Sequence, residues 1–183
     1  MQEQLPAWQW ILYIVILSST LALHELGHYL AMVKLKIPLS RVTLGLGPSI
    51  RIFGKVYLAL FPLGASVGPE PTAWAATGAR NRFKVAIAGP VASFTCAGIL
   101  LALSFLYPNA AKGLSTFASL HFAIGAFNML PIPPLDGWHV MTELMAANNR
   151  PMSARAANIA GRLGNGMIYG FGFWFVGTML TPK

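Results

Sequence analysis

Long apolar stretches separated by short polar segments dominate the pattern of this chain. Four of them, near residues 7–33, 85–107, 114–130 and 164–180, approach or exceed the roughly 20 apolar residues that a transmembrane helix needs. Residues 41–67 instead contain short strand-like runs broken by glycine and proline. The pattern therefore predicts a mainly α membrane protein with about four transmembrane helices and a β-hairpin or small sheet after the first helix.

The position of this β region relative to the bilayer is open. A surface hairpin and a re-entrant sheet both fit residues 41–67, because non-helical backbone is tolerated at membrane depth only against protein or a water-filled cavity. Prolines 131, 133 and 134 break the chain after the third span, although their surroundings stay apolar. A short helix is expected from Trp138 to Ala147.

Composition and charge agree with a membrane protein. Charged residues make up 10% of the 183 residues, against about 25% in ordinary soluble domains. Of the 13 lysines and arginines, all but Lys112 and Lys183 fall on one side of the predicted spans. The positive-inside rule then places both termini outside and explains the net charge of +8 without a nucleic-acid partner. The length suits a single domain covering residues 1–183.

The candidate chemistry begins with the sequence Leu-His-Glu-Leu-Gly-His at residues 23–28, inside the first apolar stretch. His24 and His28 fall on one helical face and can reach a single metal ion. Glu25 lies about 100° around the helix from His24, so it would be a general base rather than a ligand, and Gly27 would leave space beside the ion. The structural alternative is a pair of packed histidines with a neutralised glutamate, but ionisable side chains in hydrocarbon are functional by default.

A third ligand is required, because a catalytic zinc site normally has three protein ligands and an open position. Among the five acidic residues, Asp136 alone lies in a broken apolar segment that can fold back to the first span. We therefore predict that Asp136 completes the site. The alternative for Asp136 is an Asx-type turn before Gly137.

Two further polar residues are weaker candidates. His139 could hydrogen-bond near the metal or stabilise an oxyanion, or it could simply begin a helix. Asn128 could cap the proline-rich break or hold the backbone of a bound peptide. The residues leave both pairs of alternatives open.

At this point the motifs resemble the site-2 protease family of intramembrane zinc metalloproteases. The resemblance rests on HELGH at residues 24–28, Gly45-Leu46-Gly47, Phe61-Pro62-Leu63-Gly64, Ala88-Gly89-Pro90 and the run from Asn128 to Gly137. It implies that His24, His28 and Asp136 bind Zn²⁺ and that Glu25 is catalytic. It also implies a membrane-re-entrant β structure near residues 41–67 that pairs with substrate, and a substrate contact at Asn128.

The chain departs from the family pattern at two positions. Trp138 stands where the family commonly has a second glycine, and Ser93 where it often has asparagine. The segment from Pro108 to Gly113 also leaves no space for the PDZ domain that larger bacterial members carry between the second and third spans. Any gating of access by such a domain would have to be absent or come from another protein.

The expected function is hydrolysis of a peptide bond in or near the transmembrane segment of a single-span membrane protein, in regulated intramembrane proteolysis. We expect a multi-pass protein of a prokaryotic cell (inner) membrane, with the site toward the cytoplasm and an accessory membrane protein controlling access. An unwound substrate would pair with the strand at 56–61, through Tyr57, Leu58 and Ala59. The alternative is a non-catalytic zinc-binding scaffold or metal carrier.

Overall fold

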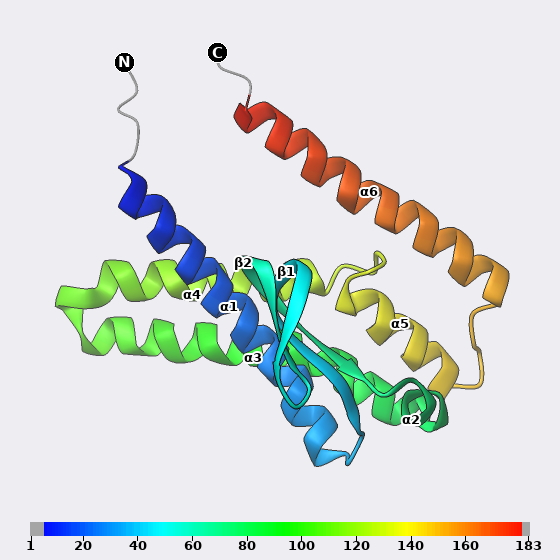
Figure 1. The fold of residues 1–183 in the computed structure, drawn as a ribbon. Helices are drawn as coiled ribbons and strands as arrows, with labels where there is room; N and C mark the ends of the chain where they lie inside the picture. Colours follow the sequence, from blue (N-terminus) through cyan, green and yellow to red (C-terminus); the bar gives the residue numbers. More distant parts are fainter. Residues whose placement is uncertain (1–5, 181–183) are drawn as a thin grey trace.

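The computed structural model describes residues 6–180, in which helices surround a proline-rich loop and flank a small sheet (Figure 1). In chain order the elements are α1 (Ala7–Lys34), β1 (Leu39–Phe53), β2 (Val56–Pro69), α2 (Pro71–Ala76), α3 (Ala79–Leu106), a 3-10 turn (Pro108–Ala110), α4 (Ala111–Asn128), α5 (Asp136–Ala147) and α6 (Ala154–Leu180). Each predicted apolar stretch coincides with a helix. Four helices begin earlier than predicted: α3 at Ala79, α4 at Ala111, α5 at Asp136 and α6 at Ala154.

The long helices alternate in direction. Helices α1 and α4 run one way and α3 and α6 the other, so the beginning of α1 and the end of α6 lie at the same end of the molecule (Figure 1). Helices α3 and α4 form a helical hairpin that packs beside α1, and α5 follows the proline-rich loop.

Two helical stretches are long and apolar enough to cross a membrane, Ile11–Lys34 in α1 and Ala79–Leu106, which is α3. Only 17% and 33% of their apolar windows are buried, whereas the core helix of a soluble protein would bury most of its apolar surface. The 28 residues of α1 give a length of about 42 Å, enough for a hydrocarbon core of about 30 Å. Within the part of the chain that the structure describes, these two alone meet that test, and four spans stay a prediction.

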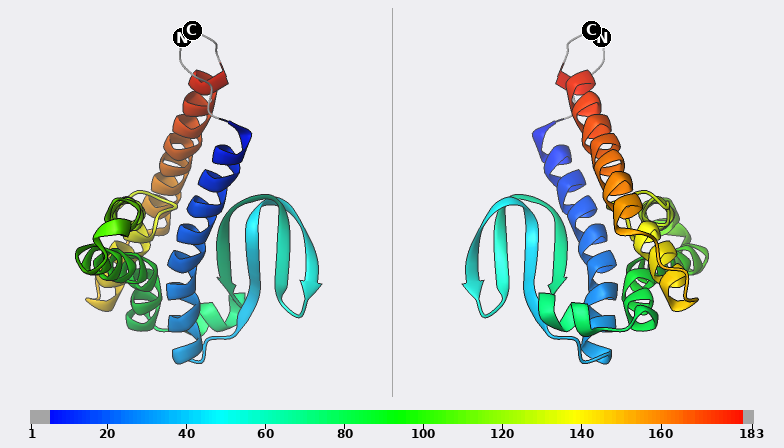
Figure 2. Two further views of the ribbon diagram at one scale, coloured as in Figure 1. Left: turned by 90° about the vertical axis from the view of Figure 1, so that its left-hand side faces the viewer. Right: turned by 90° about the vertical axis from the view of Figure 1, so that its right-hand side faces the viewer.

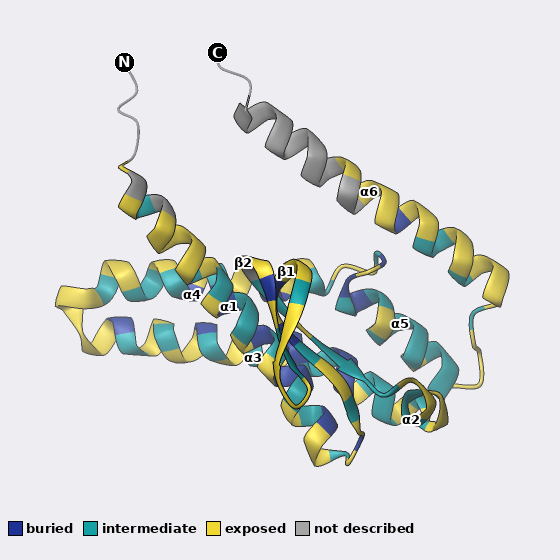
Figure 3. Cartoon of the chain, in the orientation of Figure 1, coloured by how far each residue is buried: buried dark blue, intermediate teal, exposed yellow. Residues whose placement is uncertain are grey.

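Burial is concentrated where α1, α3 and the sheet meet, and the outer faces of the helices are exposed (Figure 3). Met32, Ile37 and Val85 form the buried centre, with Val67 and Trp74 packed against it. This small core fixes the end of α1, the beginning of α3 and the sheet to one another.

Strands β1 and β2 pair antiparallel, and each bends back on itself, so each contributes two segments to the sheet (Figure 2). Residues 42–44 pair with residues 65–67 on one side and with residues 56–58 on the other. Gly45 and Gly64 have φ values of 96° and 84°, a backbone conformation that favours glycine. These glycines allow the bends.

This register corrects the predicted free edge at residues 56–61. Tyr57 pairs with both Thr43 and Arg51, and Leu58 is likewise paired on both sides. Ala59 is buried within the sheet. A strand that already has two neighbours cannot accept a third, so Tyr57, Leu58 and Ala59 offer no edge to a substrate. The edge nearest α1 belongs instead to residues 65–67 (Figure 2).

Candidate active site

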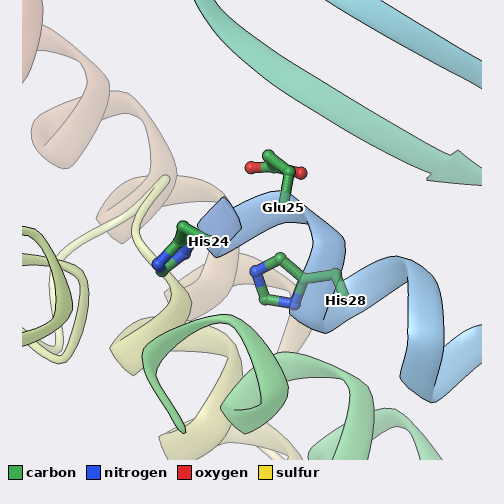
Figure 4. Close-up of side chains that lie close together, drawn as sticks. All are labelled: His24, Glu25 and His28. Carbon is green, nitrogen blue, oxygen red and sulfur yellow. The ribbon is translucent and has the colours of Figure 1, made fainter. Parts of the chain in front are cut away.

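The two histidines of α1 lie on one side of the helix, and the glutamate between them points elsewhere. His24 and His28 face α3 and the beginning of α5, whereas Glu25 points toward the strands (Figure 4). Both histidines are buried, with 3% and 8% of their surfaces exposed. One ligand atom from each of these three residues lies within 4.8 Å of the others. The helical spacing thus separates a pair of imidazoles from an acid that remains close to them.

Asp136 reaches the two imidazoles from the first turn of α5. Its Oδ2 lies 2.8 Å from Nε2 of His24 and 3.2 Å from Nε2 of His28. Ligand atoms placed 2.0–2.2 Å from a tetrahedral zinc ion are about 3.3–3.6 Å apart, so these two distances are somewhat shorter than the separations in a metal shell. Asp136 is the first residue of α5, after the N-cap Leu135, and its carboxylate bonds to the two histidines. The structure therefore brings the three predicted ligands together and disfavours the Asx-turn alternative.

The outer nitrogen of each imidazole is held by α3. Nδ1 of His28 donates to the Val85 backbone carbonyl over 2.7 Å. Because a carbonyl can only accept, Nδ1 carries a proton and Nε2 is left to face the site as the ligand atom. Nδ1 of His24 lies 2.9 Å from the hydroxyl of Ser93, which is fully buried. Contacts of this kind fix the orientation of metal-binding histidines.

Ser93 is a site residue that sequence reasoning did not assign. In the sequence it stands out only as a departure from the asparagine of the family pattern. The usable signal was its helical spacing, since Ser93 follows Gly89 by four residues and therefore lies on the same face of α3.

Gly89 provides the space that a metal would occupy. A Cβ at this position would lie 2.2 Å from Nε2 of His28 and 2.6 Å from Nε2 of His24. Gly27 has a different role from the predicted one, because its missing Cβ would meet the Ala88 carbonyl at 2.3 Å. It lets α1 approach α3. Two imidazoles and one carboxylate around such a space fit a zinc ion.

A pocket of about 330 Å³ opens in front of Glu25 and His28. Its walls come from α1, β2, α2, α3, the segment leading into α5 and α5 itself, and include Ser66, Val67, Trp74, Pro134 and His139. The backbone N–H of Val67 donates to Oε2 of Glu25 over 3.1 Å. Glu25 therefore sits between the metal ligands and the free edge of β2.

Helix α2 contributes Trp74 to the wall of this pocket and is held in place by a capping carboxylate. Glu70 accepts hydrogen bonds from the Thr72 hydroxyl and the Ala73 backbone N–H, at 2.6 and 2.8 Å. These two bonds hold the pKa of Glu70 below its usual value. The Glu70 carboxylate that caps α2 is therefore charged at neutral pH, which is the form that accepts both hydrogen bonds.

The weaker candidates for substrate contacts do not all lie at the pocket. His139 is exposed and lines the pocket. Asn128 is the last residue of α4, and its side-chain amide donates to the Ile124 carbonyl over 3.0 Å. It does not line the pocket, nor do residues 57–59. Of the predicted substrate contacts, the structure places His139 at the site.

A histidine pair and a glutamate on one helix, completed by a carboxylate from a distant segment, define a metallopeptidase site. Residues 12–113 and 108–171 match the family model of peptidase family M50, and the chain belongs to this family. The resemblance to the site-2 protease family is thereby confirmed.

Two relatives illustrate the likeness. The chain is 24% identical over 142 residues to a zinc metalloprotease of Methanocaldococcus jannaschii, an alignment covering 75% of this chain and 35% of the relative. The chain thus spans about a third of that protein. Its fold is similar to the solved site-2 protease from Methanocaldococcus jannaschii, with a TM-score of 0.54, 20% identity, and coverage of 91% of this chain and 68% of the other.

Replacing Gly89 with alanine should abolish metal binding, because the new methyl group would occupy the space between the imidazoles. We expect zinc affinity to fall by at least the roughly 100-fold seen when the surroundings of a metal site are disturbed. The measurement is competition with a chromogenic chelator on protein purified in detergent. Gly98→Ala is the matched control on α3, where an added Cβ meets nothing within 4 Å. Normal zinc binding by Gly89→Ala would contradict the assignment.

Proposed function

We propose that this protein is a zinc endopeptidase that cleaves a peptide bond in or near the transmembrane segment of another membrane protein, in regulated intramembrane proteolysis. The observation that carries the proposal is the site itself, formed on a helix apolar enough to cross a bilayer. Membership of peptidase family M50 and the likeness to a zinc metalloprotease support the zinc-dependent reaction. The location within the membrane is what points to a membrane-embedded substrate.

The proposed topology has α1, α3, α4 and α6 as spans of a prokaryotic inner membrane, with the site toward the cytoplasm. The alternating directions of these helices support it (Figure 1), as do the cations near the end of α1 and the beginnings of α3 and α6. A Cβ on Gly64 would lie 3.8 Å from Leu21, one turn before His24. The bends of the sheet therefore reach the depth of the site, which favours the re-entrant alternative.

Each residue of the site has a defined task in this reaction. His24, His28 and Asp136 would hold zinc, which when bound polarises a substrate carbonyl and lowers the pKa of a water to about 7. Glu25 accepts a proton from the attacking water and returns it to the leaving amine. Its carboxylate is already oriented toward the pocket by the Val67 N–H.

The substrate would bind as an extended strand along residues 65–67. Val67 directs its N–H away from β1, and Ala65 does the same because backbone groups alternate along a strand. A strand added here satisfies the amides that an unwound transmembrane segment would otherwise expose to hydrocarbon. A substrate carbonyl at Val67 would also compete with Glu25 for the same N–H, which would free the base as substrate pairs.

Replacing Glu25 with glutamine distinguishes a protease from a zinc-binding scaffold or carrier. Glutamine keeps the shape of the side chain but cannot accept a proton, so cleavage should fall by about 10²–10⁴-fold while zinc stays bound. The measurement is mapped cleavage of candidate single-span proteins co-expressed with either enzyme, together with zinc content. A scaffold or carrier would behave identically in both forms, and the absence of any cut that depends on Glu25 would favour that alternative.

Replacing Val67 with proline tests the edge. Proline removes one N–H, which is not part of the pairing with β1, so the sheet should survive. We expect cleavage to drop by about 2–10-fold, equivalent to a lost hydrogen bond between neutral groups of about 0.5–1.5 kcal/mol, with zinc still bound. Val67→Ala keeps the N–H and is the control. Undiminished cleavage by the proline variant would rule out this edge as the binding element.

A further inference from the structure

Arg82 of α3 and Glu143 of α5 form an ion pair away from the metal ligands. Nε of Arg82 donates to Oε1 of Glu143 over 2.8 Å, and Nη1 of Arg82 donates to the Thr77 carbonyl over 2.7 Å. The two side chains are 24% and 16% exposed. Oε2 of Glu143 is buried, with no hydrogen-bond partner among the described residues. The carboxylate therefore depends on Arg82, and losing that partner would leave a largely buried charge uncompensated.

The position of Glu143 on α5 connects this ion pair to the metal site. Glu143 follows Asp136 by seven residues, which is close to two helical turns, so both lie on the same face of α5. Asp136 meets the histidines of α1 at one end of this face, and Glu143 meets α3 two turns later. The ion pair thus fixes which face of α5 is turned toward the site.

The orientation of α5 is set by its packing on α3, and the ion pair is part of that contact. The helix follows an irregular proline-rich segment, so its orientation must be set by what it packs against. Its first turn is fixed by Gly137, where a Cβ would lie 2.2 Å from the Met129 carbonyl. Helix α5 also packs along α3, and the Arg82–Glu143 pair adds a directional polar contact to that packing.

One face of α3 carries the residues that contact the metal ligands. Arg82, Val85, Gly89 and Ser93 are separated by three, four and four residues, and therefore form one stripe along the helix. Val85 holds His28, Ser93 holds His24, and Gly89 leaves the space between their rings. Arg82 extends this stripe to the helix that carries the third ligand.

We propose that the Arg82–Glu143 ion pair is a positioning device for the third metal ligand: it holds α5 against α3 so that Asp136 meets His24 and His28. The inference rests on the proposed metal site. Neither residue touches the metal or the substrate, and the pair acts through Asp136. Weakening it should displace one ligand and leave the two histidines in place.

The test is metal binding by the full chain in detergent, measured without substrate. Glu143→Gln keeps the shape of the side chain and removes its charge, and Arg82→Leu removes the partner. Both should weaken zinc binding by about 10–100-fold, as expected for outer contacts of a metal site, and should change the visible spectrum of the Co²⁺-substituted protein. The charge-reversed pair, Arg82→Glu with Glu143→Arg, should restore most of the affinity. Lys84→Gln is the control, because Lys84 makes only an exposed contact of 3.4 Å with Asn81.

Thermal unfolding of each variant separates positioning from folding. Glu143→Gln protein that unfolds at the wild-type temperature, yet binds zinc weakly and shows an altered Co²⁺ spectrum, supports the proposal. Wild-type affinity and spectrum in both single variants would overturn it, as would a folded charge-reversed protein that binds no better than they do. Failure of the wild-type protein itself to bind zinc would instead overturn the proposed function.

Discussion

The close contact between α1 and α3 is the interaction on which the rest of the site depends. Gly27 allows α1 to lie against the Ala88 carbonyl, and at that distance Val85 and Ser93 can hold the two imidazoles. In a bilayer the hydrophobic effect does not drive helices together, so small residues and interhelical hydrogen bonds take over that role. Here the bonds that associate the helices are also the bonds that orient the metal ligands.

Polar groups in this setting must find partners within the protein, and most of those at the site do so across helices. The His28 imidazole bonds to a carbonyl of α3, and the Glu25 carboxylate bonds to an N–H of β2. In a low dielectric, satisfied groups of this kind rigidify a structure, whereas an unpaired one is costly. These bonds make the site rigid around the metal ligands. One of them joins α1 to α3 and the other joins α1 to β2.

Sequence patterns identified the parts of the site that follow from helical periodicity or from the small number of acidic residues. Helical spacing predicted that His24 and His28 share one face while Glu25 points elsewhere, and the small number of acids singled out Asp136. The free edge was misplaced because a strand pattern does not show that Gly45 and Gly64 bend the strands and place residues 56–58 between two paired neighbours. Ser93 and Glu143 were missed for a related reason, since their partners are set by the packing of separate helices, which no local pattern encodes.

In the proposed reaction, the Val67 N–H would connect substrate pairing to catalysis. A transmembrane helix has its carbonyls bonded internally and offers none to Val67, so it leaves the contact between Val67 and Glu25 intact. An unwound segment does offer a carbonyl, and it can take this donor from Glu25 while its next residue lies along the pocket. Under this arrangement the ease of unwinding decides which segments are cut. Helix-breaking residues such as glycine and proline in a substrate would then matter more than side chains that fit a particular subsite.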